Sequence, residues 1–176
     1  TCTFKQTSSE WYNVWTYGAQ NVNFNACKFY SAGKSVLVYQ ESNTFESNVT
    51  LNNCELHASA PVEGKAAVEI DASLVKKYVV NINNSVADGF AEGSVSKNAL
   101  WNIKKGETKA EVYVDEALVG GYKVDGENTY VTSTAGFTAA LEAKATKIIL
   151  SPGTYKGAFR PRVSTQFESA GQRRLL

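Results

Sequence analysis

The stretches "VTLNNCEL" (49–56) and "VVNINNSV" (79–86) share one pattern, which the shorter "NFNACKF" (23–29) repeats. In each, an alternating apolar segment leads to an asparagine, one further residue, and then a cysteine or serine. With "CTF" at 2–4 added, the aligned positions are Cys2, Cys27, Cys54 and Ser85, followed two residues later by Phe4, Phe29, Leu56 and Ala87. The intervals of 25, 27 and 31 residues indicate an internal repeat.

A second set of short segments alternates with the first along the chain. Its members are "NVWTYG" (13–18), "SVLVYQ" (35–40), "AAVEID" (66–71) and "NALWNI" (98–103). Both sets are rich in β-branched and aromatic residues and alternate as strands with one buried face do. Because no helix-length pattern separates them, βαβ units are excluded, and we expect stacked coils that cover one another's apolar faces.

Paired asparagines mark a bend inside each coil. Asn52-Asn53 and Asn83-Asn84 lie just before the repeat cysteine or serine. Asparagine tolerates the left-handed backbone conformation that a tight bend needs. Asparagines at equivalent bends can also hydrogen-bond to one another along the stack, so we expect a side-chain ladder there.

The recurring pattern V-x-F/L/I-N-x-C-x-F/L resembles that of right-handed parallel β-helix proteins of the pectate-lyase-like group. The phrases "AGKSVLVYQES", "GKAAVEIDAS" and "VSKNALWNIKKG" also resemble β-helix proteins of gut bacteria and their phages. This resemblance covers about residues 1–115 and implies a mainly β fold, a right-handed parallel β-helix (solenoid) of about four coils. Such helices serve as lyases, hydrolases, adhesins and phage fibres, so the resemblance implies a fold more than an activity.

The remaining residues predict a small C-terminal α+β appendage, 116–159, and a basic tail. Strands with turns at Gly120-Gly121 and Asp125-Gly126 precede a helix at about 133–145, for which Ser133 or Thr134 can serve as N-cap. "KIILSPGTYKGAF" (147–159) reads as a strand, a Pro-Gly turn and a second strand. The helix-then-strand order resembles the segment that caps the start of such a β-helix. Residues 160–176 hold all four arginines, and we expect them to be loose.

Composition narrows the functional classes. Residues 1–159 carry 14 Lys against 16 acidic residues, a net charge of −2, which argues against a nucleic-acid partner. No apolar run approaches the roughly 20 residues of a membrane-spanning helix, so membrane insertion is not expected. Three cysteines and one histidine give neither a closed disulfide framework nor a Cys-His zinc pattern, so no metal or cofactor is expected. Stacked at about 4.8 Å per coil, the cysteines should be buried, unbridged thiols.

No complete catalytic set stands out. The nearest candidates are Glu69 and Asp71, two positions apart on one face of a strand, with Cα atoms roughly 6–7 Å apart. That spacing is tolerable for the carboxylate pair of a glycoside hydrolase, but a polar outer face is the alternative. His57 is interpreted as a surface loop histidine.

Aromatic residues point to a sugar-binding surface. Alternation groups Trp15, Tyr17, Leu37 and Tyr39 on one face, which we expect to be the core. Stacking the second set in register puts Val38, Glu69 and Trp101 in one outer row, and Gln40 and Asp71 in the next. Aromatic rings beside carboxylates and amides are typical of sugar sites. The expected ligand-binding residues, for which simple packing remains the alternative, are Trp101, Glu69, Asp71, Gln40, Trp11 and Tyr12.

These observations favour a non-catalytic glycan-recognition or adhesin or fibre module of an exported bacterial or phage protein, extracellular or on the cell surface. Its partner would be a polysaccharide or surface glycan. One alternative is a polysaccharide lyase or glycoside hydrolase acting on an acidic polysaccharide, and a second is a purely structural stalk. The first coil begins mid-repeat at Cys2, and an uncapped coil of this kind could self-associate end to end.

Overall fold

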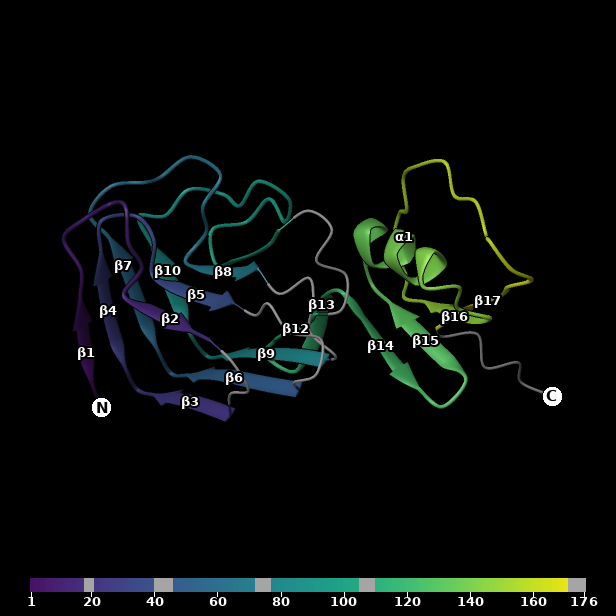
Figure 1. Cartoon of the computed structure of the whole chain (residues 1–176), viewed down its shortest axis with the longest axis horizontal. Coiled ribbons are helices and arrows are strands. Elements are labelled where there is room, and N and C mark those ends of the chain that lie inside the picture. Colours follow the sequence, from purple (N-terminus) through teal and green to yellow (C-terminus); the bar gives the residue numbers. More distant parts are fainter. Residues whose placement is uncertain (18–20, 40–45, 72–76, 105–109, 171–176) are drawn as a thin grey trace.

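The computed structural model describes residues 1–17, 21–39, 46–71, 77–104 and 110–170. These residues form a mainly β protein with one helix, α1 (Thr134–Glu142). Figure 1 shows the repeated strands on the left and the helix with the last strands on the right. The two regions join where β12 (Ala110–Val114) passes into β13 (Ala117–Gly120).

Three parallel sheets account for the repeated region, because every third strand along the chain joins the same sheet. Sheet I contains β1 (Thr3–Lys5), β4 (Lys28–Ser31), β7 (Glu55–Ala58) and β10 (Val86–Asp88). Sheet II contains β2 (Val14–Thr16), β5 (Val36–Tyr39), β8 (Val68–Asp71) and β11 (Trp101–Ile103). Sheet III contains the parallel strands β3 (Asn21–Asn25), β6 (Glu46–Asn52), β9 (Lys77–Asn83) and β12 (Ala110–Val114), and β13 (Ala117–Gly120) is added antiparallel at its edge.

The register of sheet I confirms the repeat alignment. Phe4 pairs with Phe29, Phe29 with Leu56, and Leu56 with Ala87. The aligned cysteines just before these strands follow the same order. The amides of Lys28, Glu55 and Val86 donate to the carbonyl oxygens of Cys2, Cys27 and Cys54, respectively. The sequence repeat therefore corresponds to one strand step in each sheet.

The bend between sheet III and sheet I has the predicted backbone conformation. Asn53 and Asn84 have φ values of 53° and 43°, and Ala26 has 51° at the equivalent position. The asparagine ladder is also confirmed. Its three amide-to-carbonyl bonds measure 2.9, 2.9 and 2.7 Å and join Asn52 to Asn25, Asn83 to Asn52, and Asn84 to Asn53.

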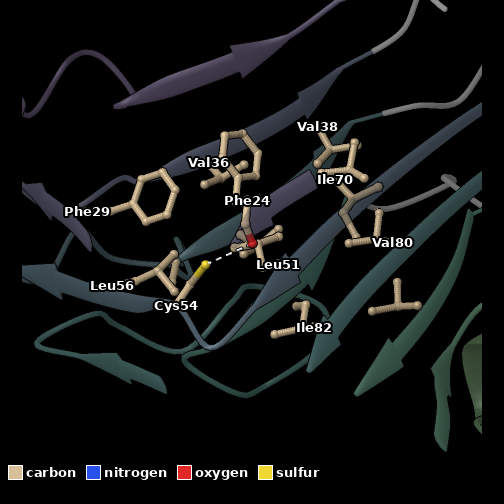
Figure 2. Packing of buried hydrophobic residues seen from close by; sticks show 14 of the residues in the cluster. Phe24, Phe29, Val36, Val38, Leu51, Cys54, Leu56, Ile70, Val80 and Ile82 are labelled. Carbon is tan, nitrogen blue, oxygen red and sulfur yellow. Dashed lines mark hydrogen bonds between the residues drawn. The ribbon is translucent and has the colours of Figure 1, made fainter. Parts of the chain in front are cut away.

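Aliphatic side chains fill the space between the three sheets, as Figure 2 shows for Leu51, Leu56, Val80 and Ile82, all fully buried. The cysteines take part unequally. Cys27 and Cys54 are buried and free, whereas Cys2, expected to be buried, is exposed because it precedes the edge strand β1.

The buried thiol of Cys54 is held by the backbone. Its Sγ donates to the carbonyl of Phe24 over 3.3 Å (Figure 2). Burial raises the pKa of the Cys54 thiol, so its reactive thiolate is disfavoured. Cys54 therefore behaves as a small core residue.

The prediction of which face of sheet II points inward is wrong. Val36 and Val38 are fully buried, whereas Trp15 and Tyr17 are 55% and 53% exposed. Branched aliphatic side chains fit the closely packed interior. There Val36 pairs with Val68 and Val38 with Ile70, and both partners are equally buried. The face that carries Trp15 and Tyr17 is therefore the outer face.

The C-terminal region has a different architecture. β13 (Ala117–Gly120) pairs antiparallel with β12, and β14 (Tyr122–Asp125) pairs antiparallel with β15 (Asn128–Val131). β16 (Lys147–Leu150) then pairs parallel with β15, and β17 (Gln166–Ser169) parallel with β16. The helix begins as predicted, since the Gly136 amide donates to the Oγ of the N-cap Ser133.

Two predictions for the end of the chain are corrected. The segment after Pro152-Gly153 forms no second hairpin strand, and Gln166–Ser169, expected to be loose, forms β17 instead. Phe167 explains this arrangement, because it pairs in register with buried Ile148 and its ring centroid lies 5.8 Å from that of Phe137. A nonlocal apolar contact thus orders part of the basic tail.

Candidate binding face on sheet II

The outer face of sheet II carries two of the predicted site residues, Glu69 and Asp71, in a register that differs from the expected one. Trp15 pairs with Leu37, Leu37 with Glu69, and Glu69 with Asn102. Tyr39 pairs with Asp71 in the next outer row. Glu69 and Asp71 therefore share the outer face of β8, as predicted.

The prediction that Val38, Glu69 and Trp101 share one outer row is wrong. Val38 pairs with Ile70, and Trp101 pairs with Val68, both in inward rows. Trp101 is half-buried and packs against the core. A shift of one residue moves a side chain to the opposite face of a strand, and the register that stacks valine on valine is the one that fills the interior.

Three aromatic rings form a cluster on this outer face, which we call the aromatic platform: Trp15, Tyr17 and Tyr39. The Trp15 and Tyr39 centroids lie 5.4 Å apart at 82°, and those of Tyr17 and Tyr39 lie 5.7 Å apart at 19°. Edge-to-face and stacked pairs at these distances hold the rings in fixed relative positions. The platform is thus an ordered aromatic surface that solvent reaches.

Glu69 is buried although it faces outward, with only 4% of its surface exposed. Its carboxylate accepts bonds from the Ala66 amide at 2.7 Å and the Asn102 side-chain amide at 3.0 Å, and Lys65 Nζ lies 3.7 Å away. Burial raises the pKa of Glu69, while these three partners act in the opposite direction. Glu69 therefore keeps its proton to a higher pH than an exposed glutamate.

Asp71 shares the outer face of β8 with this buried carboxylate, and Tyr12 lies close enough to be affected by the charges of both. Asp71 forms an ion pair with Lys104, whose Nζ is 2.8 Å from Oδ2. Tyr12 comes from the segment before β2, and its pKa is raised first by burial and then by the negative charges of Glu69 and Asp71. Lys34 Nζ lies 5.3 Å from the Tyr12 ring centroid. Two carboxylates, a phenol and cations are therefore grouped beside the aromatic platform.

The other predicted residues fall in different places. Trp11 is 58% exposed in the segment before β2, and Gln40 lies outside the described residues. His57 is a strand residue of β7 rather than a loop residue, and its ring stacks on Tyr30 with centroids 5.3 Å apart. Within the described ranges, no group of three His, Cys, Asp or Glu side chains is placed to hold a metal ion.

Sequence reasoning missed the platform because alternation separates two faces without saying which is buried. The available signal was the contrast between valines at 36 and 38 and rings at 15, 17 and 39. Valine is more often fully buried than tryptophan or tyrosine, which favours the valine face as the interior.

Comparisons of the chain with protein-family models, with curated proteins and with solved structures gave no match. Within the part of the chain that the structure describes, no helix has the length and apolar character needed to cross a membrane.

Proposed function

We propose that the three parallel sheets are the walls of one right-handed parallel β-helix of about four coils, followed by an α+β appendage. Support comes from the cyclic order in which the strands join sheets I, II and III. Left-handed residues recur at one bend of successive coils, and the asparagine ladder runs along the same bend. In this arrangement, sheet II presents a long, flat outer face.

The function that the geometry supports best is non-catalytic recognition of a glycan by this face. The protein would act as a binding, adhesin or fibre module of an exported bacterial or phage protein, at the cell surface or outside the cell. The observation that carries the proposal is the exposed aromatic platform on the same face as the Asp71–Lys104 ion pair.

The chemistry of this face matches that of a sugar chain. Exposed rings of Trp15 and Tyr17 offer apolar surface for the C–H face of a pyranose. Asp71 accepts hydrogen bonds and Lys104 donates them, so hydroxyl groups at the ring edge find both kinds of partner. Rows that recur at about 4.8 Å present these groups along a line, which suits an extended polysaccharide.

The test is binding of the full chain to an array of bacterial and plant polysaccharides, followed by titration of any bound glycan with variants. Trp15→Ala should weaken binding about ten-fold or more, equivalent to about 1.4 kcal/mol. Tyr30→Ala is the matched control, because Tyr30 is an exposed aromatic on sheet I. A flat array would contradict the proposal and favour a structural stalk, and an equal loss in both variants would contradict the platform.

The second candidate is a polysaccharide lyase or glycoside hydrolase that acts on an acidic polysaccharide. The observation that favours it is the buried Glu69, whose pKa is raised by burial, close to Asp71 and Tyr12. A protonated carboxyl can supply the proton that a leaving sugar oxygen needs. Incubation with polygalacturonate or alginate, read as new reducing ends or unsaturated products, should show turnover that Glu69→Gln abolishes and Glu55→Gln leaves intact. Absence of turnover on acidic polysaccharides would rule this candidate out.

A further inference from the structure

A cavity of about 640 Å³ lies where sheet II meets the C-terminal region. Its walls come from the end of sheet II and the segment before it, from β13 and from α1 along its length, and they include Trp101, Val119 and Thr138. This volume lies within the range of about 300–1,000 Å³ that is usual for small-molecule sites. The aromatic platform residues do not line it.

Two glycines allow the walls to approach one another. A Cβ atom at Gly120 would lie 2.8 Å from the six-membered ring of the Trp101 indole. A Cβ atom at Gly136, in the first turn of α1, would collide with the carbonyl of Gly121. The close fit of β13 against both Trp101 and α1 therefore shapes the cavity.

Hydroxyl groups in the wall are positioned by the backbone. Ser96 Oγ accepts from the Ile103 amide at 3.1 Å, and Ser133 Oγ from the Gly136 amide at 3.0 Å. Thr134 Oγ1 accepts from the Lys156 amide at 3.2 Å. A hydroxyl that accepts such a bond keeps its own hydrogen for donation. Three fixed donors thus lie around a cavity that also exposes indole carbon.

We propose that this cavity binds one neutral pyranose ring, with its apolar face against Trp101 and its oxygens accepting from Ser96, Ser133 and Thr134. Neutrality follows from the charges that the described residues bring to the wall, which are one cation, Lys104, and one carboxylate, Glu142. A charged sugar would leave one of the two facing a like charge.

The cavity and the outer face of sheet II are physically connected. Lys104 lines the cavity and also bonds to Asp71 on the outer face. Asn102 binds Glu69 through its side-chain nitrogen and accepts from the amides of Val95 and Ser96, which line the cavity, through its oxygen. These contacts place the cavity beside the carboxylates of the outer face, so the ligand class of the cavity rests on the proposed function.

The experiment uses the full chain labelled with ¹⁵N and titrated with methyl glucoside, methyl galactoside and methyl mannoside at millimolar concentration. A sugar that enters the cavity shifts the amides of Gly120, Gly121 and Gly136 and leaves the Trp15 indole signal in place. Thr138 lies at an exposed helix position that lines the cavity, so Thr138→Tyr puts a bulky ring into it. The affinity measured from these shifts should fall ten-fold or more. Trp15→Ala should leave them unchanged.

The outcomes separate this inference from the proposed function. Shifts limited to the platform, or no shift with any of the three sugars, overturn the cavity proposal, while polysaccharide binding on the array still supports the platform. Persistence of the glycine shifts in Thr138→Tyr also overturns it. Ser96→Ala is a second check, because it removes a hydroxyl without adding a larger side chain. The affinity for the sugar should fall several-fold, and the glycine shifts should still appear at saturation.

Discussion

The repeated region and the C-terminal region bury their apolar residues in different ways. In the first, Leu51 pairs with Phe24 on one side and Ile82 on the other, so a buried side chain has its equivalent in the neighbouring strand of the same sheet. In the second, the buried cluster around Phe137 is assembled once, from a helix and one face of a four-stranded sheet. Repetition makes neighbours predictable, whereas a single assembly depends on contacts between distant segments.

Polar groups show the same contrast. Side-chain amides along the bend of the repeated region bond to their equivalents in the adjacent sequence repeat. In the C-terminal region, the Tyr155 hydroxyl instead donates to the carbonyl oxygens of Val131 and Ser151, and Ser133 caps one helix. A change in the first region should thus affect the neighbouring repeats, and a change in the second should stay local.

The largest effect is expected for Leu51→Ala in the repeated core. Leu51 is fully buried between Phe24 and Ile82, so its truncation leaves a cavity that the flanking strands β3 and β9 cannot fill. The free energy of unfolding should fall by about 4 kcal/mol, measured by urea denaturation. Val86→Ala, at a 58% exposed position, is the control and should change it by less than about 0.5 kcal/mol. Similar losses in both variants would contradict the assigned core.

A smaller and more local effect is expected for Phe137→Ala. Its ring contacts Tyr155, Phe159 and Phe167, and these contacts belong to the C-terminal cluster alone. The C-terminal sheet should lose about 3 kcal/mol of stability while the repeated core keeps its own. Hydrogen exchange should therefore quicken at the amides of Ile148 and Ile149 and stay slow at Val80. Equal acceleration in both regions would show that they unfold as one unit.

The smallest effect is a gain in stability from Ala26→Asn. Ala26 has the left-handed conformation that asparagine occupies at positions 53 and 84, and a left-handed residue costs alanine about 1 kcal/mol. Asparagine tolerates this conformation and would extend the ladder by one amide, so we expect about 0.5–1 kcal/mol of added stability in thermal or urea unfolding. Ala32→Asn, in the nearby turn, serves as the control. A loss of stability in Ala26→Asn would contradict the equivalence of the three bends.

Much of the repeated region could be predicted because its signals are local and recur. The Phe4, Phe29, Leu56 and Ala87 row, the asparagine bends and the Ser133 cap all followed from short patterns. The platform could not be assigned in the same way, because alternation is symmetric between the two faces of a strand. Trp101 was misplaced for a related reason, since one residue of register separates an outer row from an inner one.

By itself, the sequence determined the spacing of the strands, the position of the bend between sheet III and sheet I, and the start of the helix. Each depends on a few adjacent residues with a strong conformational preference. Tertiary structure alone decided that Trp15 and Tyr17 face solvent, that Glu69 is buried on an outward face, and that Phe167 orders a strand in the basic tail. Burial depends on which segments stack above and beside a residue, and that information is distributed over the whole chain.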